Sequence, residues 1–158
     1  MTNPRTPQAP ESITPTNRLT ALTTQLQPTM SSSSTRPFIT CHVLDTTHGK
    51  PAPSISVTLT LLSQTPTSNA LTFNGQTNSD GRVTSWQNAD RGVNELVETM
   101  EQGEKMVWRL SFDVESYYGE GKTFWTDVEL KFSCRRSEGH YHVPLLLGPW
   151  SYTTYRGS

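Results

Sequence analysis

Two strand-like segments far apart in this sequence each carry a histidine at a position that could do acid–base chemistry. His42 lies in the alternating segment 38–45, and His142 lies in the alternating segment 140–147. Side chains on a strand point alternately to opposite faces, so both histidines face outward if the valine that follows each of them faces a core. Because imidazoles titrate near neutral pH, two of them on one outer face would suit general acid–base catalysis.

An arginine and the C-terminal residues could complete a binding site around these histidines. Arg82 follows a predicted tight turn in which Gly81 supplies a positive φ. A guanidinium beside that turn could hold a planar or anionic ligand by two parallel hydrogen bonds. The chain ends in Tyr-Arg-Gly-Ser, an aromatic and cationic sequence, whereas most termini are polar and frayed. We therefore expect catalytic roles for His42, Arg82 and His142, and substrate contacts from His42, Arg82, His140, Tyr155, Arg156 and Ser158.

Other interpretations of the same residue types lead to different sites. The His-x-His pair at 140 and 142 could bind a metal ion, but no Cys or His cluster supplies the further ligands that zinc needs, so we expect no metal and no other cofactor. Taken singly, a strand histidine is most often only hydrogen-bonded or solvated, and an arginine after Asp-Gly is most often a surface charge. His48 lies in a turn and is expected to face solvent, and Cys41 and Cys134 are expected to be reduced and structural.

The elements that must position these residues are short alternating strands. Turn-forming residues separate them about every 8 to 12 residues, a spacing typical of antiparallel β-sandwiches. The expected strands are residues 38–45, 55–62, 71–74, 106–113, 124–134, 140–147 and 150–156. Residues 93–100 are predicted to form a short helix within a polar surface insertion, 86–105, and residues 115–121 a short helix or turn. The sequence therefore predicts an all-β fold, an antiparallel sandwich.

Composition divides the chain of 158 residues into two parts. Residues 1–37 are mostly Thr, Pro, Ser, Gln and Asn, with too few apolar side chains to offset the entropy of ordering. We expect a disordered tail there and a single folded domain over residues 38–158. The net charge of −1 leaves no basic patch for nucleic acid. No apolar run approaches the roughly 18 residues of a membrane span, and the first residues lack the pattern of a secretory signal.

Several motifs resemble those of the transthyretin-related family, which includes 5-hydroxyisourate hydrolases. The matching stretches cover nearly all of the predicted domain: Cys-His-Val-Leu-Asp at 41–45, Gly-Lys-Pro-Ala at 49–52, Thr-Asn-Ser-Asp-Gly-Arg at 77–82, His-Tyr-His-Val-Pro-Leu-Leu-Leu at 140–147 and Ser-Tyr-Thr-Thr-Tyr-Arg-Gly-Ser at 151–158. The terminal Tyr-Arg-Gly-Ser is the most specific, because the hormone-carrying transthyretins lack it and the matching histidines. Two departures are a longer, more polar connection at 86–105 and Gly148 where the family often has Ser.

The resemblance implies a fold, an assembly and an activity. The fold is a transthyretin-like (prealbumin-like) sandwich of two four-stranded sheets with one short helix. Dimers form through edge strands and pair into a homotetramer, and His42, Arg82, His142 and the terminal tetrapeptide line the channel between dimers. The implied reaction is hydrolysis of the ring amide of 5-hydroxyisourate to 2-oxo-4-hydroxy-4-carboxy-5-ureidoimidazoline in urate (purine) degradation. The alternative is a transthyretin-like carrier of a small ligand without catalysis, whose channel would need apolar walls.

The N-terminal tail contains a possible targeting segment. Residues 18–26, Arg-Leu-Thr-Ala-Leu-Thr-Thr-Gln-Leu, fit the N-terminal peroxisomal pattern of a basic residue, an aliphatic residue, five residues, Gln or His, and Leu. The chain does not end in Ser-Lys-Leu, the C-terminal peroxisomal address. We expect a peroxisomal protein, with a cytoplasmic location as the alternative.

Overall fold

The computed structural model of the chain describes residues 36–62, 70–88 and 90–158. These residues form two β-sheets, two short α-helices and one turn of 3-10 helix, Arg136–Glu138. The helices are α2 (Val93–Glu98) and α3 (Val114–Tyr118). The predicted tail up to residue 35, with its targeting segment 18–26, lies outside the described residues.

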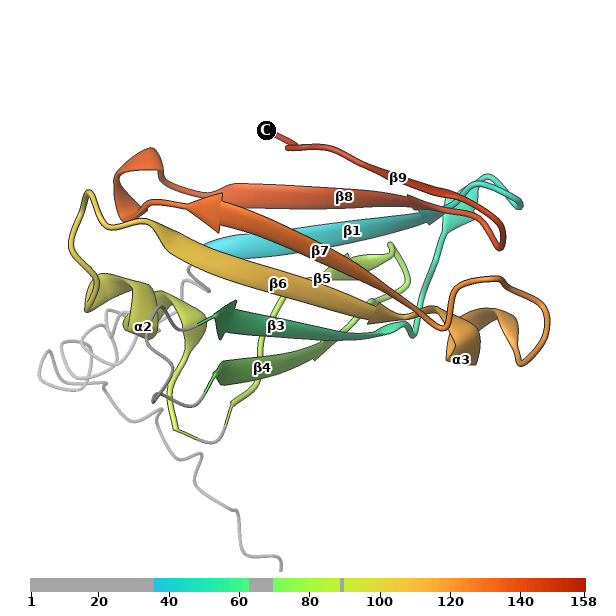
Figure 1. The fold of residues 1–158 in the computed structure, drawn as a ribbon, viewed down its shortest axis with the longest axis horizontal. Helices are drawn as coiled ribbons and strands as arrows, with labels where there is room; N and C mark the ends of the chain where they lie inside the picture. The colour runs from blue at the N-terminus through green and yellow to red at the C-terminus, as the bar shows by residue number, and fades with distance from the viewer. Residues whose placement is uncertain (1–35, 63–69, 89) are drawn as a thin grey trace, which may run out of the picture. The chain divides into compact units, whose positions relative to one another are not determined.

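The first sheet contains the segments with the histidines. Its strands are β1 (Ile39–Asp45), β2 (Lys50–Pro51), β5 (Arg82–Val83), β8 (Tyr141–Leu147) and β9 (Tyr152–Thr154). They run in the order β2-β1-β8-β9, and β5 pairs with β1 beside β2. Strands β1 and β8 lie side by side near the C-terminus of the chain, although about a hundred residues separate them in the sequence (Figure 1).

The second sheet packs against the first and carries no histidine. Its strands are β3 (Ser56–Leu62), β4 (Leu71–Gln76), β6 (Met106–Asp113) and β7 (Asp127–Cys134). All neighbours in the order β4-β3-β6-β7 are antiparallel. Strand β7 is therefore the outermost strand of this sheet, as β9 is of the other.

The predicted all-β sandwich is confirmed, with two differences in detail. The β1–β8 pair is parallel, and the short strands β2 and β5 give the first sheet five strands in place of four. Alternation indicates that a segment is a strand, but it contains no information on the direction or identity of the neighbouring strand. The two short strands flank turns, so their residues match turn patterns in the sequence.

The core lies between the sheets and follows the predicted alternation. Along β6 the side chains alternate between buried and half-buried from Met106 to Asp113. On β8 the four predicted inward residues are all buried, namely Tyr141, Val143, Leu145 and Leu147. The largest fully buried side chains are Trp108, Phe73, Phe112, Ile39, Ile55, Leu59 and Leu110.

Helix α2 corrects one prediction about residues 86–105. The sequence predicts a helix there correctly, but the interpretation as a surface insertion is wrong, because Val93, Leu96 and Val97 are buried in the core. Arg136 donates hydrogen bonds from Nη1 to the carbonyls of Glu98 and Met100, at 3.0 and 3.4 Å, at the end of this helix. The helix is thus an apolar cover of the sandwich that is polar only on its outer side.

Asp45 joins β1 to helix α3. Its buried carboxylate accepts hydrogen bonds from the His48 ring at 2.8 Å and from the Tyr117 hydroxyl at 3.1 Å, as well as from the Thr47 amide at 2.8 Å. Burial alone would raise the pKa of Asp45, but these hydrogen bonds outweigh it and lower the pKa. The side chain of His48 is 67 % exposed, as predicted.

The remaining composition-based expectations concern cysteines and membranes. Cys41 and Cys134 are both unpaired and buried, and burial raises the pKa of each thiol to about 12. Their predicted structural role is therefore confirmed. Within the described parts of the chain, no helix is long and apolar enough to cross a membrane.

Candidate active site

Three adjacent strands place His42, Arg82 and His142 on one outer face of the first sheet. In the β1–β5 pair, His42 is directly opposite Arg82. In the parallel β1–β8 pair, Thr40 is opposite His142, so His142 lies diagonally across from His42 on the same face. The buried residues of β1, Ile39, Cys41 and Val43, occupy the other face. The predicted outward orientation of the two histidines is confirmed.

The turn before Arg82 fixes that residue beside β1. The Asn78 side-chain oxygen accepts hydrogen bonds from the amides of Asp80 and Arg82, at 3.0 and 2.9 Å. Gly81 has φ of 70°, and a Cβ there would run into the Val43 carbonyl oxygen. Glycine is therefore required for both the turn and its close approach to β1.

A threonine hydroxyl connects the two histidines of β8. Thr40 Oγ1 lies 2.9 Å from His142 Nδ1 and 3.1 Å from His140 Nε2. The other ring nitrogen of His140, Nδ1, lies 2.8 Å from the Pro37 carbonyl oxygen. Both nitrogens of His140 are therefore engaged by the protein, so His140 reaches the predicted site through Thr40.

The pKa values of His42 and His142 are both lowered from the ordinary histidine value. For His42 the largest cause is burial, followed by the charge of Arg82, and a backbone hydrogen bond with Asp80 acts in the opposite direction. For His142 burial again comes first, and Arg82 is the strongest of the nearby positive charges. Both imidazoles are consequently neutral near neutral pH, which is the state that accepts a proton.

One ring nitrogen of His42 has no protein partner. Its Nε2 atom is buried and makes no hydrogen bond with any described residue. Buried polar atoms are nearly always hydrogen-bonded in folded proteins, so an atom of this kind points to a partner such as a water molecule or a bound ligand. His42 thus has a free position for a reacting group.

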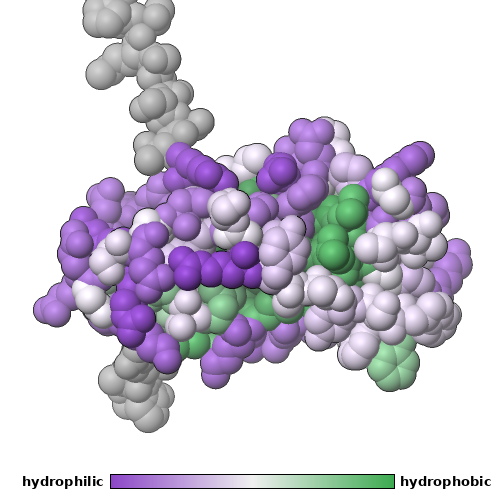
Figure 2. Space-filling model, turned by 90° about the horizontal axis from the view of Figure 1, so that it is seen from above, coloured by the Kyte–Doolittle hydropathy of each residue, from purple (hydrophilic) through white to green (hydrophobic). Residues whose placement is uncertain are grey.

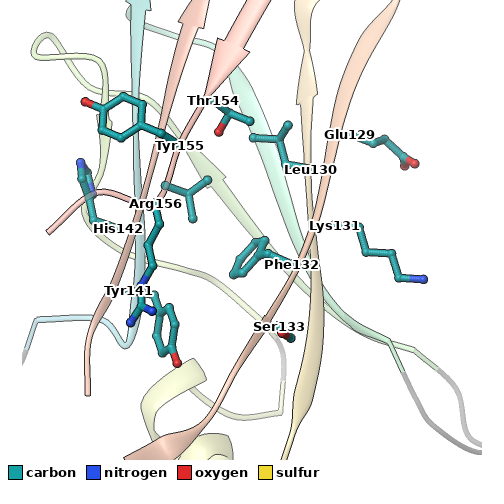
Figure 3. A pocket seen from close by; sticks show the side chains of 11 residues that line it. Glu129, Leu130, Lys131, Phe132, Ser133, Tyr141, His142, Thr154, Tyr155 and Arg156 are labelled. Atoms are coloured by element: carbon teal, nitrogen blue, oxygen red, sulfur yellow. The ribbon is translucent and has the colours of Figure 1, made fainter. Parts of the chain in front are cut away.

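The C-terminal segment reaches the same face. The Gly157 amide donates a hydrogen bond of 2.9 Å to the His142 carbonyl, and a Cβ on Gly157 would lie only 2.7 Å from His142 Cδ2. Figure 3 shows the rings of Tyr155 and His142 on the same side of the strands, away from Phe132. Tyr155 is 57 % exposed, and so its ring is available to a ligand.

The two other predicted terminal residues are placed differently. Arg156 makes an ion pair of 3.2 Å with Glu138 and lies over the ring of Tyr141, at 4.9 Å from its centroid (Figure 3). Its side chain is 65 % exposed. Ser158 is exposed as well. The structure thus brings His42, Arg82, His142 and Tyr155 to one face, while Arg156 is directed toward Glu138.

Sequence reasoning missed Thr40 as a member of this site. Thr40 alternates in register with His42, so the strand pattern placed it on the correct face, but a threonine has no acid–base signature of its own. The Pro37 carbonyl left no trace in the sequence pattern, because any residue could supply it.

The assembled groups fit hydrolysis of a carbonyl compound. Two neutral imidazoles can move protons to and from a water molecule and a leaving nitrogen. The guanidinium opposite His42 can orient a polar ligand and stabilise negative charge that develops on oxygen. Among the described residues, no group of three or more His, Cys, Asp or Glu side chains is arranged to hold a metal ion.

Comparisons with curated proteins identify relatives of one name. A probable 5-hydroxyisourate hydrolase of Schizosaccharomyces pombe is 39 % identical over 125 residues, which is 77 % of this chain and 92 % of that protein. The 5-hydroxyisourate hydrolase of Deinococcus radiodurans is 39 % identical over 77 % of this chain and 97 % of its own length. The mouse 5-hydroxyisourate hydrolase is 37 % identical, over 76 % of this chain and 94 % of its own length.

Solved structures agree on the fold. A crystal structure of (S)-allantoin synthase is similar over 78 % of this chain with a TM-score of 0.59 and 32 % identity, and this chain spans 44 % of that protein. The transthyretin of Sparus aurata matches 77 % of this chain and 97 % of its own length, with a TM-score of 0.59 and 25 % identity. Residues 39–157 match the HIUase/Transthyretin family, and the chain therefore belongs to that family.

Proposed function

We propose that this protein hydrolyses the ring amide of 5-hydroxyisourate in urate degradation. The observation that carries the proposal is the outer sheet face on which His42, Arg82 and His142 lie on adjacent strands beside the chain terminus. The relatives named 5-hydroxyisourate hydrolase, at 37–39 % identity over most of this chain, support it. The product is 2-oxo-4-hydroxy-4-carboxy-5-ureidoimidazoline.

The reaction needs a base, an acid and stabilisation of an oxyanion. A neutral imidazole of the His42/His142 pair takes a proton from water, whose oxygen bonds to the ring carbonyl carbon. Arg82 orients the substrate and stabilises the negative charge on the carbonyl oxygen. The carbon–nitrogen bond then breaks, the carbonyl carbon becomes a carboxyl group, and the leaving nitrogen receives a proton.

The test is the loss of ultraviolet absorbance when the protein meets freshly oxidised urate. The His142→Asn variant should show a kcat lower by about 10² to 10⁴, the usual range for loss of a general acid–base group. His48→Asn, which changes an exposed histidine away from this face, is the matched control and should keep its rate. Turnover of His142→Asn near the wild-type rate would exclude His142 from the mechanism.

A transthyretin-like carrier is the alternative function. It would bind a small aromatic ligand and leave the absorbance of oxidised urate to decay at its spontaneous rate. The observation against it is the pair of neutral imidazoles and the guanidinium on the face that would line the channel. We also expect full activity to survive exhaustive chelation, and a loss that added metal restores would show that a metal takes part.

The assembly we favour is a homotetramer with the sites between dimers. Supporting it, β7 and β9 are the outermost strands of the two sheets, and such edges are where strands of a second copy can pair. A groove of about 370 Å³ separates them and is lined by apolar residues that include Leu130, Phe132 and Tyr141. From above, Figure 2 shows small hydrophobic areas among hydrophilic ones. Sedimentation combined with the activity assay tests this proposal, and a fully active monomer would contradict it.

The peroxisome is the proposed location. The support is the pattern in residues 18–26, where Leu19, Leu22 and Leu26 have the spacing of one helical face. Residues 1–37 fused to a fluorescent reporter should give punctate fluorescence, and Arg18→Glu in that fusion should make it diffuse. A diffuse wild-type fusion would favour the cytoplasmic alternative without changing the proposed reaction.

A further inference from the structure

The hydroxyl of Thr40 is the centre of a hydrogen-bonded chain behind the active face. Thr40 is only 9 % exposed, and its single hydroxyl contacts one nitrogen from each of two imidazoles, His140 and His142. The chain continues from His140 to the Pro37 carbonyl. Each of these groups has a limited capacity to donate, so the protonation state of every nitrogen in the chain can be worked out from its neighbours.

The Pro37 end of the chain fixes the tautomer of His140. A backbone carbonyl oxygen can only accept, so His140 Nδ1, 2.8 Å away, carries a proton and donates it. Burial and the charge of Arg36 lower the pKa of His140, and only the hydrogen bond to the Pro37 carbonyl acts to raise it. The ring is therefore neutral near neutral pH, and its Nε2 is an unprotonated acceptor.

The tautomer is then passed through Thr40 to His142. Because His140 Nε2 is an acceptor, the Thr40 hydroxyl donates its one proton to it across 3.1 Å. Toward His142 the same oxygen can only accept, so His142 Nδ1, at 2.9 Å, must carry a proton. Neutral His142 therefore has its lone pair on Nε2.

We propose that Thr40 and His140 are positioning residues that hold His142 in the Nδ1–H tautomer and so make its Nε2 the general base of the reaction. The inference rests on the proposed hydrolase function and adds an assignment to it, since the pair of histidines alone left the identity of the base open. Thr40 and His140 contribute by orienting His142.

The surroundings of the His142 ring agree with this assignment. The Cδ2 atom, which is bonded to Nε2, faces Gly157 of the terminal segment, where an added Cβ would be only 2.7 Å away. The proton-accepting edge of the ring thus lies beside the C-terminus. When Nε2 takes a proton from water, Nδ1 keeps its hydrogen bond to Thr40, so the imidazolium forms without any rearrangement of the chain.

Helix α2 anchors the far end of the same chain. The Asn94 side chain accepts a hydrogen bond of 2.6 Å from the Phe38 amide and donates one of 3.2 Å to the Arg36 carbonyl. These two contacts hold the backbone on both sides of Pro37, whose carbonyl binds His140. The long connection 86–105 therefore extends the positioning chain, because its helix is fixed to the core by Val93, Leu96 and Val97.

Replacement of Thr40 tests the proposal. Thr40→Val keeps the side-chain shape but removes both hydrogen bonds, whereas Thr40→Ser retains the hydroxyl. Outer partners that fix a histidine tautomer are typically worth about 10- to 100-fold in activity. We expect Thr40→Val to lower kcat by about that factor with KM nearly unchanged, and Thr40→Ser to restore most of it. Thr58→Val, on the outer face of the other sheet, is the matched control.

A second readout follows the tautomer itself. The chain has four histidines, so ring-nitrogen NMR shifts of protein labelled with 15N-histidine can be assigned with single His→Asn variants. Wild-type His142 should show protonated Nδ1 and unprotonated Nε2, and Thr40→Val should shift it toward the Nε2–H form. Asn94→Ala should shift both the tautomer and kcat in the same direction by less, and Glu98→Gln on the same helix should shift neither.

The outcomes separate the two proposals. An inactive wild-type protein would refute the hydrolase function, and the NMR readout would still decide whether Thr40 and His140 set the tautomer. Protonated Nε2 in wild-type His142, or a Thr40→Val variant with unchanged kcat and tautomer, would overturn the positioning chain while leaving the hydrolase function in place.

Discussion

Gly157→Ala is a sharp test of how closely the C-terminus approaches the active face. The new Cβ would lie 2.7 Å from His142 Cδ2, 3.2 Å from Pro144 Cγ and 3.3 Å from the His142 carbonyl oxygen. Ordinary van der Waals contact begins at 3.4 Å, so the ring and the terminal segment must separate by about 0.7 Å, the difference between the two distances. Gly157 has no positive φ, so the effect of alanine is steric and not a matter of backbone strain.

A shift of that size should matter for catalysis and little for folding. Misplacement of a catalytic group by about 1 Å can cost about 10²-fold in rate, so we expect kcat/KM for 5-hydroxyisourate to fall between tenfold and a hundredfold, about 1.4 to 2.7 kcal/mol of transition-state stabilisation. The segment after β9 contributes no residue to the core cluster. The free energy of unfolding should therefore change by less than about 0.5 kcal/mol.

The assay is the decay of substrate absorbance, corrected for the spontaneous reaction, with urea unfolding measured on the same samples. Gly103→Ala is the matched control, because a Cβ there would meet no atom within 4 Å. A Gly157→Ala variant with wild-type kcat/KM would show that the terminal segment does not lie against His142 in the working protein. A large loss of stability instead would show that the segment is part of the folding core.

Three further outcomes are expected. Deletion of residues 155–158 should abolish turnover while leaving the unfolding midpoint nearly unchanged, since the segment follows the last core-facing positions. Arg82→Gln should move the acid limb of the kcat/KM–pH profile to higher pH, because Arg82 lowers the pKa of His42 and of His142 and its removal raises both; an unmoved limb would mean that neither imidazole controls the rate. Asp45→Asn should destabilise the fold by about 1–3 kcal/mol at neutral pH. The folded-state pKa of Asp45 is depressed, so this stability is present above the unfolded pKa and lost as pH falls through the folded one. Urea titrations of both proteins should therefore converge below about pH 4.

The strands and their buried faces could be predicted from the sequence because both follow from local chemistry. Alternation of apolar and polar residues fixes which side chains face a core, and the inward residues of β8 are buried as that rule requires. Gly81 closes its turn because positive φ is a property of a single residue. The helix within 93–100 was predictable for the same reason, but its burial against the sandwich was not.

The partners of these elements could not be predicted from local patterns. That β1 pairs in parallel with β8 depends on the whole chain, and this pairing places Thr40 opposite His142. The contact of Arg156 with Glu138 depends equally on the turn Arg136–Glu138, which lies next to the terminal segment only in the folded protein.

The sequence by itself determined the inventory of the site: two histidines of matching alternation, an arginine after a glycine turn and an aromatic, cationic terminus. Only the tertiary structure decided which nitrogen of which histidine is free. That choice depends on hydrogen-bond partners contributed by residues more than a hundred positions away, such as Thr40 for His142 and the Pro37 carbonyl for His140. Imidazole can carry its proton on either nitrogen, so its tautomer is set by the partner that the fold supplies and not by the residue type.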